Sequence, residues 1–305
     1  MEISDLLSLH LPQREDEPAV SRVLAYKYNH ELMRMNDEKG ILAFDTHYDR
    51  EGRTIQQTSY GPSGIEMDRI KLEYNAEGMI SKKETYAEGV LAETEVNYFE
   101  GERLVKTEIF YSGDLGTVIH TIWNENDLIV EIRNEDDEGE VELKVTKDYD
   151  EKKNLLEEVH TYDWGGEARF VYTYDDQGNQ ITLRATDQDG NLVRNIENTY
   201  DSEGNLATRK FRDFQSGESY NSKHSVQEEN GKSVHVVELS DGSVQKIVLN
   251  DVAGDLAEEF VIYGPDKGIR LQQSFKYENG FRKEETYFRR GVDHHRLEYK
   301  YEFYD

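Results

Sequence analysis

A repeat of about 25 residues runs through most of this chain and limits what it can fold into. In most copies an aromatic residue precedes a short turn segment with Asp or Asn and Gly, as in Tyr174-Asp175-Asp176-Gln177-Gly178-Asn179, although several copies lack the Asp or the Gly. Successive copies follow at intervals of 24 to 26 residues, and further copies occur at Tyr28, Tyr277 and Tyr301. The evenly spaced aromatic positions are Tyr48, Tyr74, Tyr98, Trp123, Tyr149, Tyr174 and Tyr200.

Each repeat divides into two strands and two turns. A second aromatic position recurs at the half-period, for example at Tyr86, Tyr111 and Tyr162. Between the turns, apolar and polar residues alternate with period two, as over 141–149, which is typical of a strand with one buried face. Asp or Asn followed by Gly favours tight hairpins, because the Asx side chain accepts backbone hydrogen bonds and Gly adopts a positive φ. The strands are therefore predicted to be antiparallel.

These observations predict an all-β fold. We expect a long antiparallel meander of about 24 strands that curls or spirals, because open sheets rarely exceed about ten strands without curling. The repeated tyrosines would lie on its concave, partly buried side. A six-bladed β-propeller with blades of about 50 residues is the alternative. Residues 1–19 are predicted to be an N-terminal leader or cap with a short helix around 4–10, and residues 20–305 a single β-repeat domain.

The motif Tyr200-Asp201-Ser202-Glu203-Gly204-Asn205-Leu206 resembles the YD repeat of the RHS and teneurin family. The motif at 174–181 is similar, and the resemblance extends from about Tyr28 to Asp305. The resemblance implies a long antiparallel sheet that spirals into a shell, and it implies an association with bacterial toxin systems.

Composition narrows the classes of partner. The chain has 36 Lys and Arg against 64 Asp and Glu, a net charge of −28, which argues against binding to nucleic acid or to an anionic membrane. Twenty Tyr, 11 Phe and two Trp argue for a folded chain. There is no cysteine, which excludes disulfides and cysteine-based sites. The sequence shows neither a secretory signal nor a long apolar run, so we expect a cytoplasmic location.

No pattern of catalytic or metal-binding residues is evident, so the chain is predicted to be no enzyme and to need no cofactor or metal. The nine histidines lack the spacing of a metal site. Calcium is the alternative considered for Asp187-Gln188-Asp189-Gly190-Asn191. An EF-hand, however, needs Glu at its twelfth position, which is Asn198 here, and a Gly-containing turn explains the same residues.

The candidate binding residues lie in an acidic stretch. Residues 134–163 contain twelve acids against four lysines, which is typical of a solvated face but could attract a basic partner. Trp164 follows in a turn and either anchors an interface or folds back onto the sheet edge. The predicted partner-binding residues are Glu135, Asp136, Asp137, Glu138 and Trp164.

The leading functional hypothesis is a non-enzymatic scaffold that binds a basic protein. Its specific form is a bacterial immunity-type protein that neutralises a basic toxin. A carbohydrate-binding repeat protein and a structural shell fragment around another polypeptide are the alternatives. The segment Leu297–Phe303 near the end of the sequence is expected to leave an unpaired sheet edge. Such an edge could pair with a second copy of the chain, so a homo-oligomer formed through it is a further hypothesis.

Overall fold

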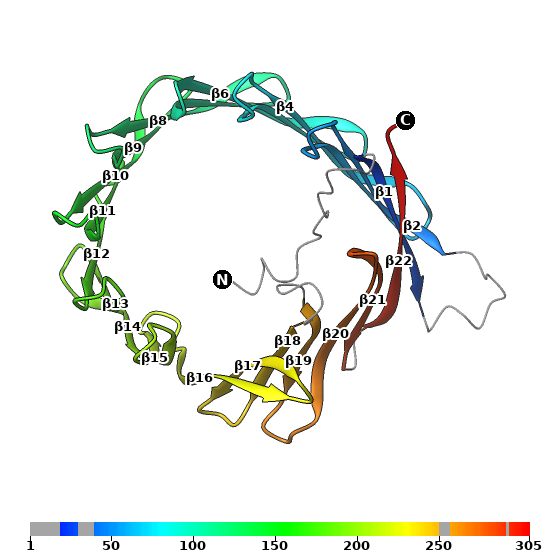
Figure 1. Cartoon of the computed structure of the whole chain (residues 1–305). Helices are drawn as coiled ribbons and strands as arrows, with labels where there is room; N and C mark the ends of the chain where they lie inside the picture. Colours follow the sequence, from blue (N-terminus) through cyan, green and yellow to red (C-terminus); the bar gives the residue numbers. More distant parts are fainter. Residues whose placement is uncertain (1–18, 30–39, 250–256, 291–292) are drawn as a thin grey trace. The chain divides into compact units, whose positions relative to one another are not determined.

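The computed structural model describes residues 19–29, 40–249, 257–290 and 293–305, which form 22 β-strands and no helix (Figure 1). The prediction of an all-β, antiparallel fold is confirmed, because every strand pairing found in the described chain is antiparallel. The helix expected around residues 4–10 and most of the predicted leader fall outside the described residues.

The strands follow the repeat closely. The first eleven are β1 (Val20–Asn29), β2 (Ile41–Tyr48), β3 (Thr54–Tyr60), β4 (Glu66–Tyr74), β5 (Ile80–Ala87), β6 (Val90–Glu100), β7 (Arg103–Tyr111), β8 (Asp114–Trp123), β9 (Ile129–Asp136), β10 (Val141–Tyr149) and β11 (Leu155–Tyr162). The others are β12 (Glu167–Tyr174), β13 (Gln180–Asp187), β14 (Leu192–Tyr200), β15 (Leu206–Asp213), β16 (Ser219–Glu229), β17 (Lys232–Leu239), β18 (Val244–Leu249), β19 (Ala257–Tyr263), β20 (Ile269–Glu278), β21 (Phe281–Arg289) and β22 (Asp293–Phe303).

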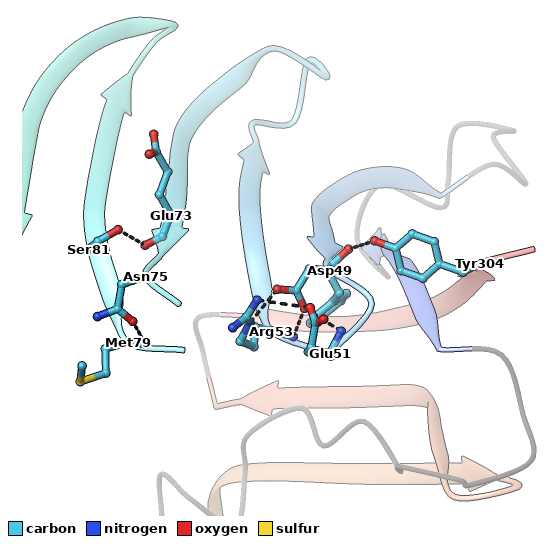
Figure 2. A network of polar contacts seen from close by, with 9 residues as sticks. Asp49, Glu51, Arg53, Glu73, Asn75, Met79, Ser81 and Tyr304 are labelled. Carbon is cyan, nitrogen blue, oxygen red and sulfur yellow. Dashed lines mark hydrogen bonds and ion pairs between the residues drawn. The ribbon is translucent and has the colours of Figure 1, made fainter. Parts of the chain in front are cut away.

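The Asp and Gly of the repeat build its hairpin turn. In the β12–β13 turn, Asp175 Oδ1 accepts the backbone N–H groups of Gln177 and Asn179, both at 2.9 Å. The Asp175 carbonyl accepts the N–H of Gly178, whose φ is +87°. This is a type I turn closed by a left-handed residue, a geometry that joins antiparallel strands. The same device occurs at Asp49 in the β2–β3 turn and at Asn75 in the β4–β5 turn. Figure 2 shows Asp49 with Glu51 and Arg53, and Asn75 with Met79.

The sheet is closed by its two terminal strands, which corrects the predicted open spiral and the predicted free edge. All 22 strands belong to one sheet, and β1 pairs with both β2 and β22. Leu297–Phe303 thus has β21 on one side and β1 on the other, because Val23 pairs with Tyr301 and Lys27 with Leu297. A single sheet also replaces the separate blades of the propeller alternative.

Contacts divide the chain into two compact units. The described residues of unit 1 are those up to Leu72, residues 85–90 and those from His224 onward, whereas unit 2 comprises Glu73–Glu84 and Leu91–Lys223. Both hydrophobic clusters found in the described chain lie in unit 1. One contains Phe260 and Phe275, and the other contains Val20, Val23 and Tyr48.

In both units several tyrosines of the repeat tie neighbouring turns together. Tyr174 lies at the end of β12, and its hydroxyl donates a hydrogen bond of 2.9 Å to the carbonyl of Leu155. Leu155 follows the β10–β11 turn, which lies at the same edge of the sheet. This contact explains why the repeat uses Tyr, since Phe has no hydroxyl to donate. The corresponding pairs are Trp123 Nε1 with Leu104, Tyr149 with Ile129, Tyr200 with Gln180, Tyr277 with Ala257 and Tyr301 with Arg282.

Tyr174→Phe is expected to lower the free energy of unfolding by about 1 kcal/mol, because it removes one partly buried hydrogen bond. Tyr172→Phe in the same strand is the control, since no hydrogen bond of the Tyr172 hydroxyl is found among the described residues. Urea unfolding followed by circular dichroism measures both. Equal losses for the two variants would contradict the role given to the Tyr174 hydroxyl.

Candidate functional site

Two neighbouring turns of unit 2 bring most of the predicted binding residues to one edge of the sheet. β9 and β11 both end at this edge, and the strands from β9 to β12 pair in sequence order. The Asp163 N–H donates to the Glu142 carbonyl at 3.0 Å and thereby joins the β11–β12 turn to the start of β10. Residues 136–142 and 162–166 are called the rim below.

The four predicted acids play different roles. Glu135 lies on β9 and forms an ion pair with Arg133 at 2.9 Å, and its Oε2 lies 3.4 Å from His120 Nε2. Asp136 Oδ1 accepts the N–H groups of Glu138 and Glu140 at 3.0 and 2.8 Å, so this residue stabilises the turn. Asp137 and Glu138 are exposed, and among the described residues neither forms an ion pair. Of these four acids, only Asp137 and Glu138 are exposed and without an ion pair among the described residues.

Trp164 is the most exposed large apolar side chain found in the described chain, with 71% of its surface accessible. Its ring stacks on Tyr162, with centroids 5.5 Å apart and planes at 15°. It also covers the buried Gly166, where an added Cβ would lie only 1.8 Å from a ring carbon. The ring therefore rests on its own turn while most of its surface faces solvent.

The sequence reasoning missed two contributions to the rim. Glu140 and Glu142 are exposed and extend the acidic surface toward Asp163. Gly166 has no side chain, so the indole of Trp164 can pack directly against its backbone. The sequence Gly165-Gly166 indicates this role only if the ring folds over its own turn. Tyr111 and Phe214 are exposed aromatic residues at other turns of the same edge. Tyr111 is one of the aromatic positions that recur at the half-period of the repeat.

The turn considered for calcium is explained by hydrogen bonds within it. Asp187 Oδ1 accepts the N–H groups of Asp189 and Asn191 at 3.0 and 2.8 Å, and Oδ2 accepts Asn191 Nδ2 at 3.1 Å. Within the described residues, no group of three or more His, Asp or Glu side chains is placed to hold a metal ion. This turn has the same construction as the other Asp-capped turns.

No helix in the described part of the chain is long and apolar enough to span a membrane.

No family model matches the chain, and no curated protein matches it either. Several solved structures are similar at a low level. The crystal structure of TcdB2-TccC3-TEV is 12% identical with a TM-score of 0.33, covering 91% of this chain and 17% of the other.

Two further structures are similar to the same extent. The crystal structure of TcdB2-TccC3-Cdc42 is 12% identical with a TM-score of 0.32 and covers 80% of this chain. This chain spans only 17% and 18% of the two TcdB2-TccC3 chains. A porin-like protein from Bacteroides uniformis is 11% identical with a TM-score of 0.31, covering 94% of this chain and all of the other. None of these likenesses assigns the chain to a family.

Asp136→Ala is expected to lower the free energy of unfolding by about 1 kcal/mol, because two backbone N–H groups lose their acceptor. Asp137→Ala, one position further in the same turn, is expected to change it by less than about 0.5 kcal/mol, as is usual for an exposed position. Urea unfolding of both variants tests this division of roles. Equal effects would mean that Asp136 does not support the turn.

The capped turns also predict how stability depends on pH. Side-chain and backbone hydrogen bonds from Asn lower the pKa of Asp150, Asp175, Asp187 and Asp201 below its usual range. Below about pH 4 the unfolded chain binds more protons than the folded chain, so stability is present above that pH and falls as the pH decreases. We expect urea midpoints to decrease from pH 5 to pH 3.

Asp175→Asn is the matched variant for this pH dependence, since Asn75 already caps an equivalent turn without a titratable group. Its midpoint should decrease less between pH 5 and pH 3 than that of the wild type. An unchanged or larger decrease would contradict the assignment to the turn carboxylates.

Proposed function

We propose that the chain is a non-enzymatic protein-binding scaffold that captures a basic protein through the rim. The observation that carries this proposal is the exposed Trp164 beside a turn whose Asp137 and Glu138 carboxylates make no ion pair among the described residues. An exposed Trp is costly in water and is a common anchor of interfaces. Unpaired carboxylates next to it select a cationic partner.

The charge of the rim acts mainly on recognition and association rate. A surface of one sign raises the local concentration of oppositely charged partners, and mobile ions screen this attraction. Glu135 and Asp136 contribute less to it, because Glu135 is paired with Arg133 and Asp136 is engaged in the turn. Asp137, Glu138, Glu140 and Glu142 are the exposed acids that remain.

The specific form of this proposal is a cytoplasmic, bacterial immunity-type protein that neutralises a basic toxin. Two features support it. The YD-like motifs at 174–181 and 200–206 suggest a divergent relative of a family that is associated with toxin systems. The net charge of −28 suits a partner whose own surface is strongly basic, such as a nuclease.

The test is capture from a lysate of the native organism, at low and at raised salt, read by mass spectrometry. Asp137→Asn with Glu138→Gln should weaken retention of the basic partner about fivefold or more at low salt. Asp176→Asn with Glu203→Gln removes the same charge from exposed positions at the opposite edge and should have no effect. Equal retention by both double variants would contradict the rim proposal.

Glycan arrays test the carbohydrate alternative with the same proteins, because a flat exposed indole can also stack on a sugar ring. Glycan binding that depends on Trp164 and is insensitive to salt would replace the protein-binding proposal. The immunity form itself fails if the captured basic protein is not inhibited by this chain.

A further inference from the structure

We infer that the outward face of Trp164 is a receptor for a cationic side chain, so that the partner inserts a Lys or Arg there and not an apolar residue. This inference rests on the proposed function and specifies the chemistry of its central contact. It follows from how the ring is held, from the contacts of other rings in the chain and from the charges around it.

The ring is held in one orientation before any partner arrives. Tyr162 stacks against it with an interplanar angle of 15°, and the Gly166 backbone lies beneath it. The Asp163 carboxylate also accepts the Trp164 N–H at 2.6 Å, which fixes the turn. With these contacts in place, 71% of the Trp164 surface is still accessible to solvent, so ring surface remains for a ligand and little conformational entropy is lost when one binds.

Other rings in this chain already carry cations of the chain itself. Arg212 lies 4.6 Å from the centroid of Phe214, at another turn of the same edge. Lys106 lies 4.0 Å from the Tyr98 centroid, and Arg69 lies 4.3 Å from that of Tyr86. Trp has the strongest cation–π attraction of the three aromatic residues. Yet within the described residues no Lys or Arg lies over Trp164.

Two cations on the strands that adjoin the rim, β10 and β12, are engaged elsewhere. Arg169, on β12, forms ion pairs with Glu157 at 2.6 Å and with Glu167 at 3.4 Å. Lys144, on β10, pairs with Glu131 at 2.9 Å. The outward face of Trp164 can therefore bind a cation from outside the chain.

The surrounding charges decide between a cationic and an apolar ligand. Asp163 lies within the same turn, Glu142 is hydrogen-bonded through its backbone to that turn, and Asp137, Glu138 and Glu140 occupy the neighbouring turn. An apolar ligand over the ring would bring a low-dielectric surface toward these carboxylates without neutralising them. A guanidinium or ammonium group gains from both the ring and the carboxylates.

The second tryptophan shows that this arrangement is particular to Trp164. Trp123 is half-buried, and its Nε1 donates to the carbonyl of Leu104 at 2.8 Å. It occupies the tyrosine position of the repeat and has the structural role described above. The two indoles therefore report different environments, and a change in the fluorescence of the exposed indole marks ligand binding at the rim.

The probe for the experiment is an octa-arginine peptide, titrated at low salt by calorimetry and by tryptophan fluorescence. The wild type should bind it with a change in Trp164 emission. Trp164→Leu keeps an apolar side chain but removes the π face, and it should bind about 3- to 30-fold more weakly. Phe214→Leu is the control and should bind like the wild type, because the guanidinium of Arg212 already lies over the Phe214 ring.

The outcomes separate the inference from the proposed function. If Asp137→Asn with Glu138→Gln weakens octa-arginine binding but Trp164→Leu binds as tightly as the wild type, the cation receptor is wrong and the acidic rim remains. Equal weakening by Trp164→Leu and Phe214→Leu would also overturn the receptor. No binding by the wild type would overturn both. Circular dichroism of each variant verifies that the sheet is intact.

Discussion

The capped hairpin turn is the interaction on which the rest of this structure depends. A single carboxylate or amide, as in Asp175 or Asn75, satisfies two backbone N–H groups, and a left-handed residue then redirects the chain. Because this unit recurs at intervals of about 25 residues in most repeats, it sets the length of the strands and the edge at which they end. In several repeats the tyrosine before the turn, as at Tyr174, also ties it to the previous turn at that edge.

The local structure was predictable because its signals are local. Alternation over 141–149 and the residues of the 174–179 turn identify strand, turn and direction of pairing without reference to any distant segment. Closure was not predictable in this way. The β1–β22 pairing joins segments at opposite ends of the chain, and the apolar–polar alternation of Leu297–Phe303 is the same whether its neighbour is solvent or another strand.

The candidate site was predictable in composition but not in detail. The acids at 135–138 form one run in the sequence, yet the structure assigns Glu135 to an ion pair, Asp136 to a turn and only Asp137 and Glu138 to solvent. Asp136 shares its spacing to Gly139 with Asp175 and Gly178, so its turn role could be recognised from the repeat. The seat of Trp164 on Gly166 depends on side-chain orientation, which the sequence does not specify.

The most direct test of the rim is a footprint of the complex with the basic protein captured from the native lysate, by oxidation of tryptophan and by carbodiimide labelling of carboxylates. We expect Trp164 and the carboxylates of 136–142 to be protected from labelling in the complex, whereas the carboxylates of the Asp175–Asn179 turn at the opposite edge are labelled as in the free protein. Unchanged labelling of Trp164, with protection at the opposite edge instead, would contradict the rim proposal.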